Sequence, residues 1–135
     1  MLSKSVEYAI KSLVLINCKG LFINVEIISE ELNIPKSFTS KILKNLVKKE
    51  YILSQRGPGG GFSKNDYKRT LKELIIDIDG DFKYDKCALR LLECSDLKPC
   101  PLHDHFKSIK SQINDNFMQI TIDKICENPN KILKL

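Results

Sequence analysis

A chain of 135 residues, of which 42% are hydrophobic, can form one small domain with an extension, and this composition excludes a disordered or fibrous protein. No run without a charged residue exceeds seven residues, which excludes a membrane span and the apolar part of a signal peptide, so we expect a cytoplasmic protein without membrane contact. The net charge of +5 comes from residues 1–69, which carry 12 Lys and Arg against 6 Asp and Glu, and this half is expected to bind a polyanion.

The basic half begins with a pattern typical of three helices. The first is expected over residues 3–19, with Ser3 as its N-cap and Gly20 after its last turn. The second is expected over residues 24–32 and the third from about residue 35 to residue 50. Two short helices joined by a tight turn predict a helix-turn-helix, whose second helix enters the major groove of DNA.

The faces of the third helix follow from its helical spacing. The apolar residues that we expect to face the core are Phe38, Ile42, Leu43, Leu46 and Val47. The remaining polar and basic face is expected to contact DNA through Ser37, Thr39, Ser40, Lys41 and Lys44.

Residues 51–64 predict a β-hairpin that forms a wing. Two short strands flank a glycine-rich turn, in which Gly57, Gly59 and Gly60 allow the tip to approach a narrow groove closely. Arg56, at the edge of the turn, suits the negative potential of an A·T-rich minor groove. A glycine-rich loop can also bind nucleotide phosphates, but neither the Lys-Ser/Thr pair nor the third glycine of such motifs is present.

Beyond the wing, Thr70 and Glu73 predict a capping box that opens a short helix, which ends at Gly80. After a loop-like segment, a long helix is expected from about Pro101 to Cys126, with apolar residues on one face. Such a helix is too long for a small domain to cover. We therefore expect it to pack on its copy in a homodimer, with an intramolecular core helix as the alternative. The chain then divides into a winged domain (1–80), a cysteine segment (81–104), a dimerisation helix (101–127) and a tail (128–135).

Three of the five cysteines lie close together, with the spacing C-x6-C-x5-C-x2-H for Cys87, Cys94, Cys100 and His103. Three thiolates and an imidazole suit either an iron–sulfur cluster or zinc, and the spacing alone leaves both open. Cys100 is expected at the start of the long helix, where the helix dipole favours a thiolate. The two isolated cysteines, Cys18 and Cys126, are expected to be buried within helices.

The string RGPGGGF at residues 56–62, the helix-turn-helix before it and the three-cysteine segment after it resemble the winged-helix iron–sulfur regulators that include IscR and NsrR. The resemblance covers nearly the whole chain and implies a mainly α fold with a small β-wing. It also implies a homodimeric transcription factor, more often a repressor, that binds a palindromic DNA operator and is not an enzyme.

The resemblance also implies a set of cluster ligands. Cys87, Cys94 and Cys100 match the family's three cysteines, with one extra residue between the first two, and His103 matches the histidine ligand of the IscR branch. In the NsrR branch the partner subunit provides an acidic ligand from its first helix, and Glu7 stands near the matching position of this sequence. An acid in the first turn of a helix is also ordinary. A histidine ligand favours a [2Fe-2S] cluster over a [4Fe-4S] cluster.

Two other functions stay open from the sequence. The first is the same regulator with a zinc site or a thiol/disulfide switch in place of the cluster. The second is an enzyme or cluster carrier, but the chain has only two histidines and shows no pairing of a nucleophile with a base.

Overall fold

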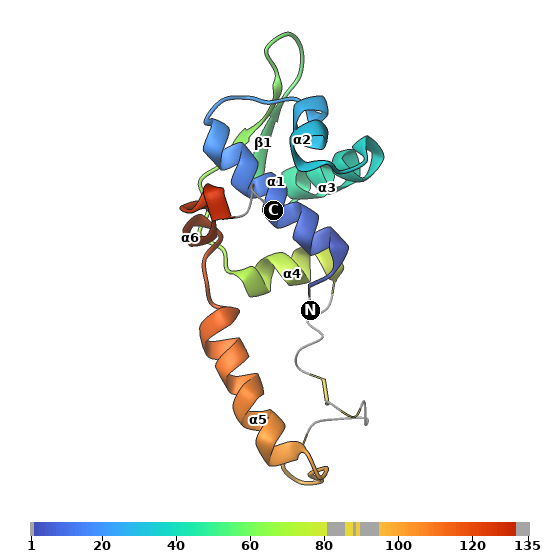
Figure 1. The fold of residues 1–135 in the computed structure, drawn as a ribbon, viewed down its shortest axis with the longest axis vertical. Coiled ribbons are helices and arrows are strands. Elements are labelled where there is room, and N and C mark those ends of the chain that lie inside the picture. The colour runs from blue at the N-terminus through green and yellow to red at the C-terminus, as the bar shows by residue number, and fades with distance from the viewer. Residues whose placement is uncertain (1, 81–85, 88, 90–94, 132–135) are drawn as a thin grey trace.

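The computed structural model describes residues 2–80, 86–87, 89 and 95–131. In chain order the elements are α1 (Lys4–Lys19), α2 (Val25–Leu32), α3 (Lys36–Lys48), β1 (Ile52–Gln55), β2 (Gly61–Lys64), α4 (Leu71–Asp79), α5 (His103–Gln112), a π-helical turn (Ile113–Phe117), α6 (Ile122–Cys126) and a 3₁₀ turn (Pro129–Lys131). Figure 1 shows α1 in the middle of a group that includes α2, α3, α4 and α6. The hairpin projects at one end of the molecule and α5 extends away at the other. The mainly α fold with a small β-wing is therefore confirmed.

The ends of the first helices follow from the capping residues in the sequence. The Ser3 side chain accepts a hydrogen bond from the amide of Val6, and Gly20 ends α1 in the left-handed conformation with φ 66°. Asn24 caps α2 in the same way as Ser3 caps α1. Both hydrogen bonds of the Thr70 capping box are present at the start of α4. These local predictions are confirmed.

The wing is a two-stranded antiparallel hairpin in which Ile52 pairs with Lys64 and Gln55 pairs with Gly61. Ile23, in the segment between α1 and α2, adds an isolated bridge to Phe62. This bridge attaches the base of the hairpin to the helices. The main core behind it contains buried residues of α1, α2, α3 and α6 together with the fully buried Tyr51 and with Leu74 of α4.

The predicted inner face of α3 is wrong at its first turn. Thr39 is 1% exposed, whereas Phe38 is 57% exposed. Thr39, Ile42, Leu43 and Leu46 have the spacing i, i+3, i+4 and i+7, so they share one stripe, and Phe38 lies outside it. The Thr39 hydroxyl satisfies its hydrogen-bonding capacity by donating to the carbonyl of Pro35 at 3.2 Å, which allows a polar side chain to be buried there.

The single long helix predicted over residues 101–126 is also wrong. The helix α5 begins at His103, and the chain leaves helical geometry after the π-helical turn before Thr121 caps the short α6. The intervening backbone pairs with the segment before α4, where Ile122 donates to the carbonyl of Arg69 at 2.9 Å and Leu71 donates to the carbonyl of Ile120 at 2.8 Å. Burial of Met118 and Ile122 against the helical core accompanies this pairing and accounts for the break.

The isolated cysteines differ from each other. Cys18 is exposed near the end of α1, so its predicted burial is wrong. Cys126 packs against the main core, and its burial raises the pKa of its thiol to about 11, with a smaller contribution from the charge of Asp123.

Candidate nucleic-acid interface and cysteine segment

The outer face of α3 presents the groups expected of a recognition helix. Ser37, Lys41 and Lys44 are exposed and Ser40 is half-buried. Thr39, which was expected on this face, lies in the core. It therefore positions the turn before α3 instead of reaching a base.

The charges around this helix leave a cationic surface. The acid Glu26 of α2 pairs with Lys36, and Glu31 pairs with Lys19 at 2.6 Å. In the part of the chain that the structure describes, no ion pair involves Lys41 or Lys44. Cations that are not neutralised within the protein are the groups that release counterions on binding a phosphate backbone.

The wing presents Arg56, Gly57 and Gly59 at its exposed tip. Gly57 and Gly59 have positive φ angles of 92° and 73°, and a side chain at either would meet open space. Gly60 is different, because a Cβ there would lie 2.3 Å from the carbonyl oxygen of Gln55. The absence of a side chain at Gly60 is thus required for closing the hairpin, a reason that the sequence prediction did not include.

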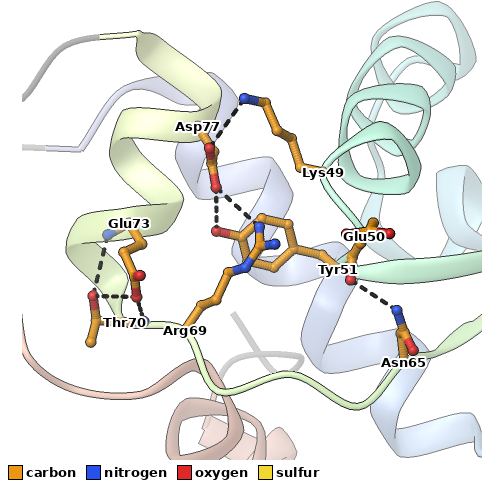
Figure 2. A network of polar contacts seen from close by, with 8 residues as sticks. All are labelled: Lys49, Glu50, Tyr51, Asn65, Arg69, Thr70, Glu73 and Asp77. Atoms are coloured by element: carbon orange, nitrogen blue, oxygen red, sulfur yellow. Dashed lines mark hydrogen bonds and ion pairs between the residues drawn. The ribbon is translucent and has the colours of Figure 1, made fainter.

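A polar network joins α4 to the end of the recognition helix, as Figure 2 shows. Asp77 of α4 accepts a hydrogen bond from the Tyr51 hydroxyl at 2.9 Å and pairs with Arg69 and Lys49, each at 3.2 Å. The Arg69 guanidinium also lies 4.6 Å from the centroid of the Tyr51 ring. No sequence pattern indicates this network, because its members are spread over residues 49–77 without a recognisable spacing.

The cysteine segment is described only in part. Cys87 is buried and Cys100 is half-buried, while Cys94 lies outside the described residues. Cys100 precedes α5 instead of lying within it, and its carbonyl accepts a hydrogen bond from the amide of His103 at 2.9 Å. Among the described residues, no group of three His, Cys, Asp or Glu side chains is arranged to hold a metal ion.

His103 is 5% exposed and has a carboxylate partner within the same segment. Its Nε2 lies 2.8 Å from Oδ1 of Asp96, and the same oxygen accepts a hydrogen bond from Lys107 at 2.7 Å. Lys107 and His103, in that order, lower the pKa of the Asp96 carboxyl group. A carboxylate that holds an imidazole in one orientation is the usual partner of a metal-binding histidine.

Glu7 lies on α1 and pairs with Lys11 at 2.8 Å and with Lys4 at 3.0 Å. Hydrogen bonds from Lys11 and then Lys4 lower the pKa of its carboxyl group. Within the described chain Glu7 is therefore an ion-paired acid in the first turn of a helix. Its role as a ligand toward a second subunit stays a prediction.

The winged-helix geometry and the cysteine segment agree with what the chain is similar to. A family model described as Rrf2, iron-dependent transcriptional regulator, matches residues 2–128. The chain belongs to the Rrf2 family. This family includes IscR and NsrR, and its members are transcriptional regulators and not enzymes, so the sequence-based recognition is confirmed. The Rrf2 winged helix is a DNA-binding module.

Individual Rrf2-type relatives extend this finding. A candidate HTH-type transcriptional regulator of Aquifex aeolicus is 36% identical over 126 residues, which cover 89% of this chain and 87% of that protein. IscR of Pectobacterium atrosepticum is 28% identical over 103 residues, covering 75% of this chain and 62% of IscR. The solved structure of CymR, the global cysteine regulator of B. subtilis, has a TM-score of 0.73 at 15% identity, covering 94% of this chain and 96% of CymR, and so shows the shared fold.

The donor groups of this Rrf2-family chain fit an iron–sulfur cluster in their chemistry. Cys87 and Cys100 provide sulfur in a segment that also holds the buried imidazole of His103.

Within the described ranges, no helix has the length and hydropathy needed to cross a membrane.

Proposed function

We propose that this chain is a homodimeric transcriptional repressor whose affinity for a palindromic DNA operator is set by an iron–sulfur cluster. Cys87, Cys94 and Cys100 would provide three ligands and His103 the fourth, which favours a [2Fe-2S] cluster. Glu7 of the partner subunit is the other candidate for the fourth ligand, and it would favour a [4Fe-4S] cluster. A bound cluster would supply a centre through which the protein senses redox state, nitric oxide or iron–sulfur status.

The observation that carries this proposal is the position of the cysteine segment in the chain. The segment directly follows α4, whose Asp77 is bonded to Tyr51 and Lys49 at the end of the recognition helix. A change in the order of residues 81–104 would therefore act on a helix that contacts the DNA-binding half. A ligand shifts such an equilibrium only if it binds the two arrangements with different affinity.

The proposed dimer rests on the apolar residues of α5 and the turn after it. Figure 1 shows α5 extending away from the winged helices. Ile109 is 54% exposed and Phe117 is 37% exposed, and Phe106 and Ile113 on the same side are only half-buried. A row of apolar side chains at helical spacing is stabilised when a second copy covers it, and a two-fold pair of subunits matches a palindromic operator.

Anaerobic purification tests the cluster. We expect a coloured protein with iron and acid-labile sulfide, and we expect Cys94→Ala to lose both while its circular dichroism spectrum stays unchanged. Cys18→Ala is the matched control, because Cys18 is exposed on α1, outside the segment. Colourless protein with stoichiometric zinc would contradict the cluster and indicate a zinc site. A disulfide between segment cysteines would instead indicate a thiol switch.

Operator binding is tested separately. The loaded protein, incubated with fragments of the host genome, should retain a small set of fragments with two-fold symmetric sequences. Loss of the cluster should change the affinity for these fragments. Equal affinity of the loaded and the cluster-free protein would contradict regulation by the cluster.

A further inference from the structure

Among the described residues, the aromatic ring of Phe38 belongs to neither hydrophobic core cluster. Phe38 is the third residue of α3 and is 57% exposed, while the next residue, Thr39, takes the place in the core stripe. A single exposed apolar side chain is common on protein surfaces. Phe38 is unusual in its position, because the first turns of the second helix of a helix-turn-helix are the ones that reach the base edges.

The surroundings of Phe38 are suited to DNA. Lys41 follows it by one helical turn, so the two side chains are neighbours, and Ser37 precedes it on the exposed side of the helix. Lys41 and Lys44 have no ion pair within the described residues and can contact phosphates on either side of a groove. The ring therefore lies beside a cationic face, and this charge identifies DNA as its partner.

The chemistry of the ring restricts what it can recognise. A phenyl group neither donates nor accepts a hydrogen bond, so it is blind to the polar atoms on the base edges. The C5-methyl group of thymine is the one apolar feature that distinguishes a base in the major groove.

We propose that Phe38 packs on the C5-methyl group of one thymine in each operator half-site and thereby selects thymine at that position. This inference rests on the proposed DNA-binding function and adds the base class that one residue reads.

The test uses the full-length protein and duplexes that it selects from a random-sequence library. Each thymine of a selected duplex is replaced in turn by uracil, which removes only the methyl group. Wild-type protein should lose about four-fold in affinity at one thymine per half-site, as expected from the burial of a methyl group. In Phe38→Ala, binding to the thymine duplex should weaken, and the difference between thymine and uracil should disappear.

Lys44→Ala is the matched control, since it removes a phosphate-binding charge from the same helix face. It should weaken binding to the thymine and the uracil duplexes equally. The proposal is overturned if uracil costs the wild type less than about 1.5-fold at every thymine, or if Phe38→Ala keeps the wild-type discrimination. In both cases a specific selected duplex would still support the proposed function, whereas a failure to select any duplex would overturn both proposals.

Discussion

The hydroxyl group of Tyr51 donates a hydrogen bond to Oδ2 of Asp77 at 2.9 Å, between residues that are 26 positions apart in the chain. Tyr51 is fully buried immediately before β1, and Asp77 lies in the last turn of α4. Burial is the main cause that raises the pKa of Tyr51 well above its usual value, so the hydroxyl keeps its proton into the alkaline range, where an ordinary tyrosine loses it. The bond connects the DNA-binding half to the helix that leads into the cysteine segment.

Tyr51→Phe tests the strength of this connection. The change removes a hydrogen bond to a charged acceptor and should lower the free energy of unfolding by about 1.5–3 kcal/mol in urea denaturation. Tyr8→Phe is the control, because Tyr8 is only half-buried and no hydrogen bond of its hydroxyl is found among the described residues. A loss in Tyr8→Phe equal to that in Tyr51→Phe would show that the hydrogen bond contributes nothing specific.

Gly61→Ala should damage the wing more than Gly59→Ala. A Cβ at Gly61 would lie 2.3 Å from the carbonyl oxygen of Ile23, whereas a Cβ at Gly59 meets open space. Gly59→Ala should therefore cost only the strain of a positive φ, about 1 kcal/mol. Gly61→Ala should cost more, because the bridge between Ile23 and Phe62 must open. Thermal unfolding of both variants measures the difference, and equal losses would refute the close approach.

Cys126 should resist alkylation in the folded protein. Burial raises the pKa of its thiol to about 11, so at pH 8 only about one thiol in a thousand is ionised. Iodoacetamide labelling read by peptide mass spectrometry should modify the exposed Cys18 well before Cys126. Unfolding in urea should equalise the two rates. Labelling of folded Cys126 as fast as Cys18 would contradict its burial.

The same pKa predicts how stability depends on pH. The folded pKa of Cys126, about 11, lies above the ordinary thiol value of 9.0, so the unfolded chain loses this proton first as pH rises. The contribution to stability is fully present below about pH 9 and is lost as pH rises through about 11. The raised pKa of Tyr51 acts in the same direction. Cys126→Ala should reduce the decline in the free energy of unfolding between pH 9 and pH 11, measured by urea denaturation.

Arg56→Ala should weaken operator binding by roughly 1–3 kcal/mol if the guanidinium contacts a base edge. Fluorescence anisotropy with a selected duplex measures the affinity. Arg56→Lys keeps the charge but not the planar fork of donors, so it should recover only the part of the loss that comes from phosphate attraction. An unchanged affinity in Arg56→Ala would show that the wing makes no contribution.

Ile109→Glu should convert the proposed dimer into a monomer. Ile109 is 54% exposed on the apolar side of α5, and a charge there would be buried without a partner in a two-fold interface. Ser108→Glu places the same charge on the neighbouring exposed position and should leave the dimer intact. Light scattering coupled to gel filtration gives the mass. A dimer that persists in Ile109→Glu would exclude this face as the interface.

Much of the winged fold could be predicted because its signals are local. Ser3, Asn24 and Thr70 bond to amides within one helical turn, and Gly20 and Gly80 end helices through their own φ angles. The hairpin follows from a glycine-rich turn between two short apolar segments. In each case the residues that form the structure are neighbours in the chain.

The candidate site was only partly predictable, because its remaining contacts join distant segments. Thr39 faces the core in place of the predicted Phe38, and this outcome depends on how α3 lies against α1 and α2. Met118 and Ile122 end a helical pattern by packing on the core, and Asp77 accepts a hydrogen bond from Tyr51, 26 positions away in the chain.

By itself, the sequence of this Rrf2-family chain thus determined the helices of the winged half, their caps and the wing, since short-range hydrogen bonds and helical spacing specify them. The candidate cluster ligands follow from the cysteine spacing and the family resemblance, and they stay a prediction. The tertiary structure decided which side chain of α3 faces outward, where the C-terminal helix breaks and how Asp77 connects α4 to Tyr51. Those outcomes depend on burial and charge pairing between segments whose distance in space no local pattern contains.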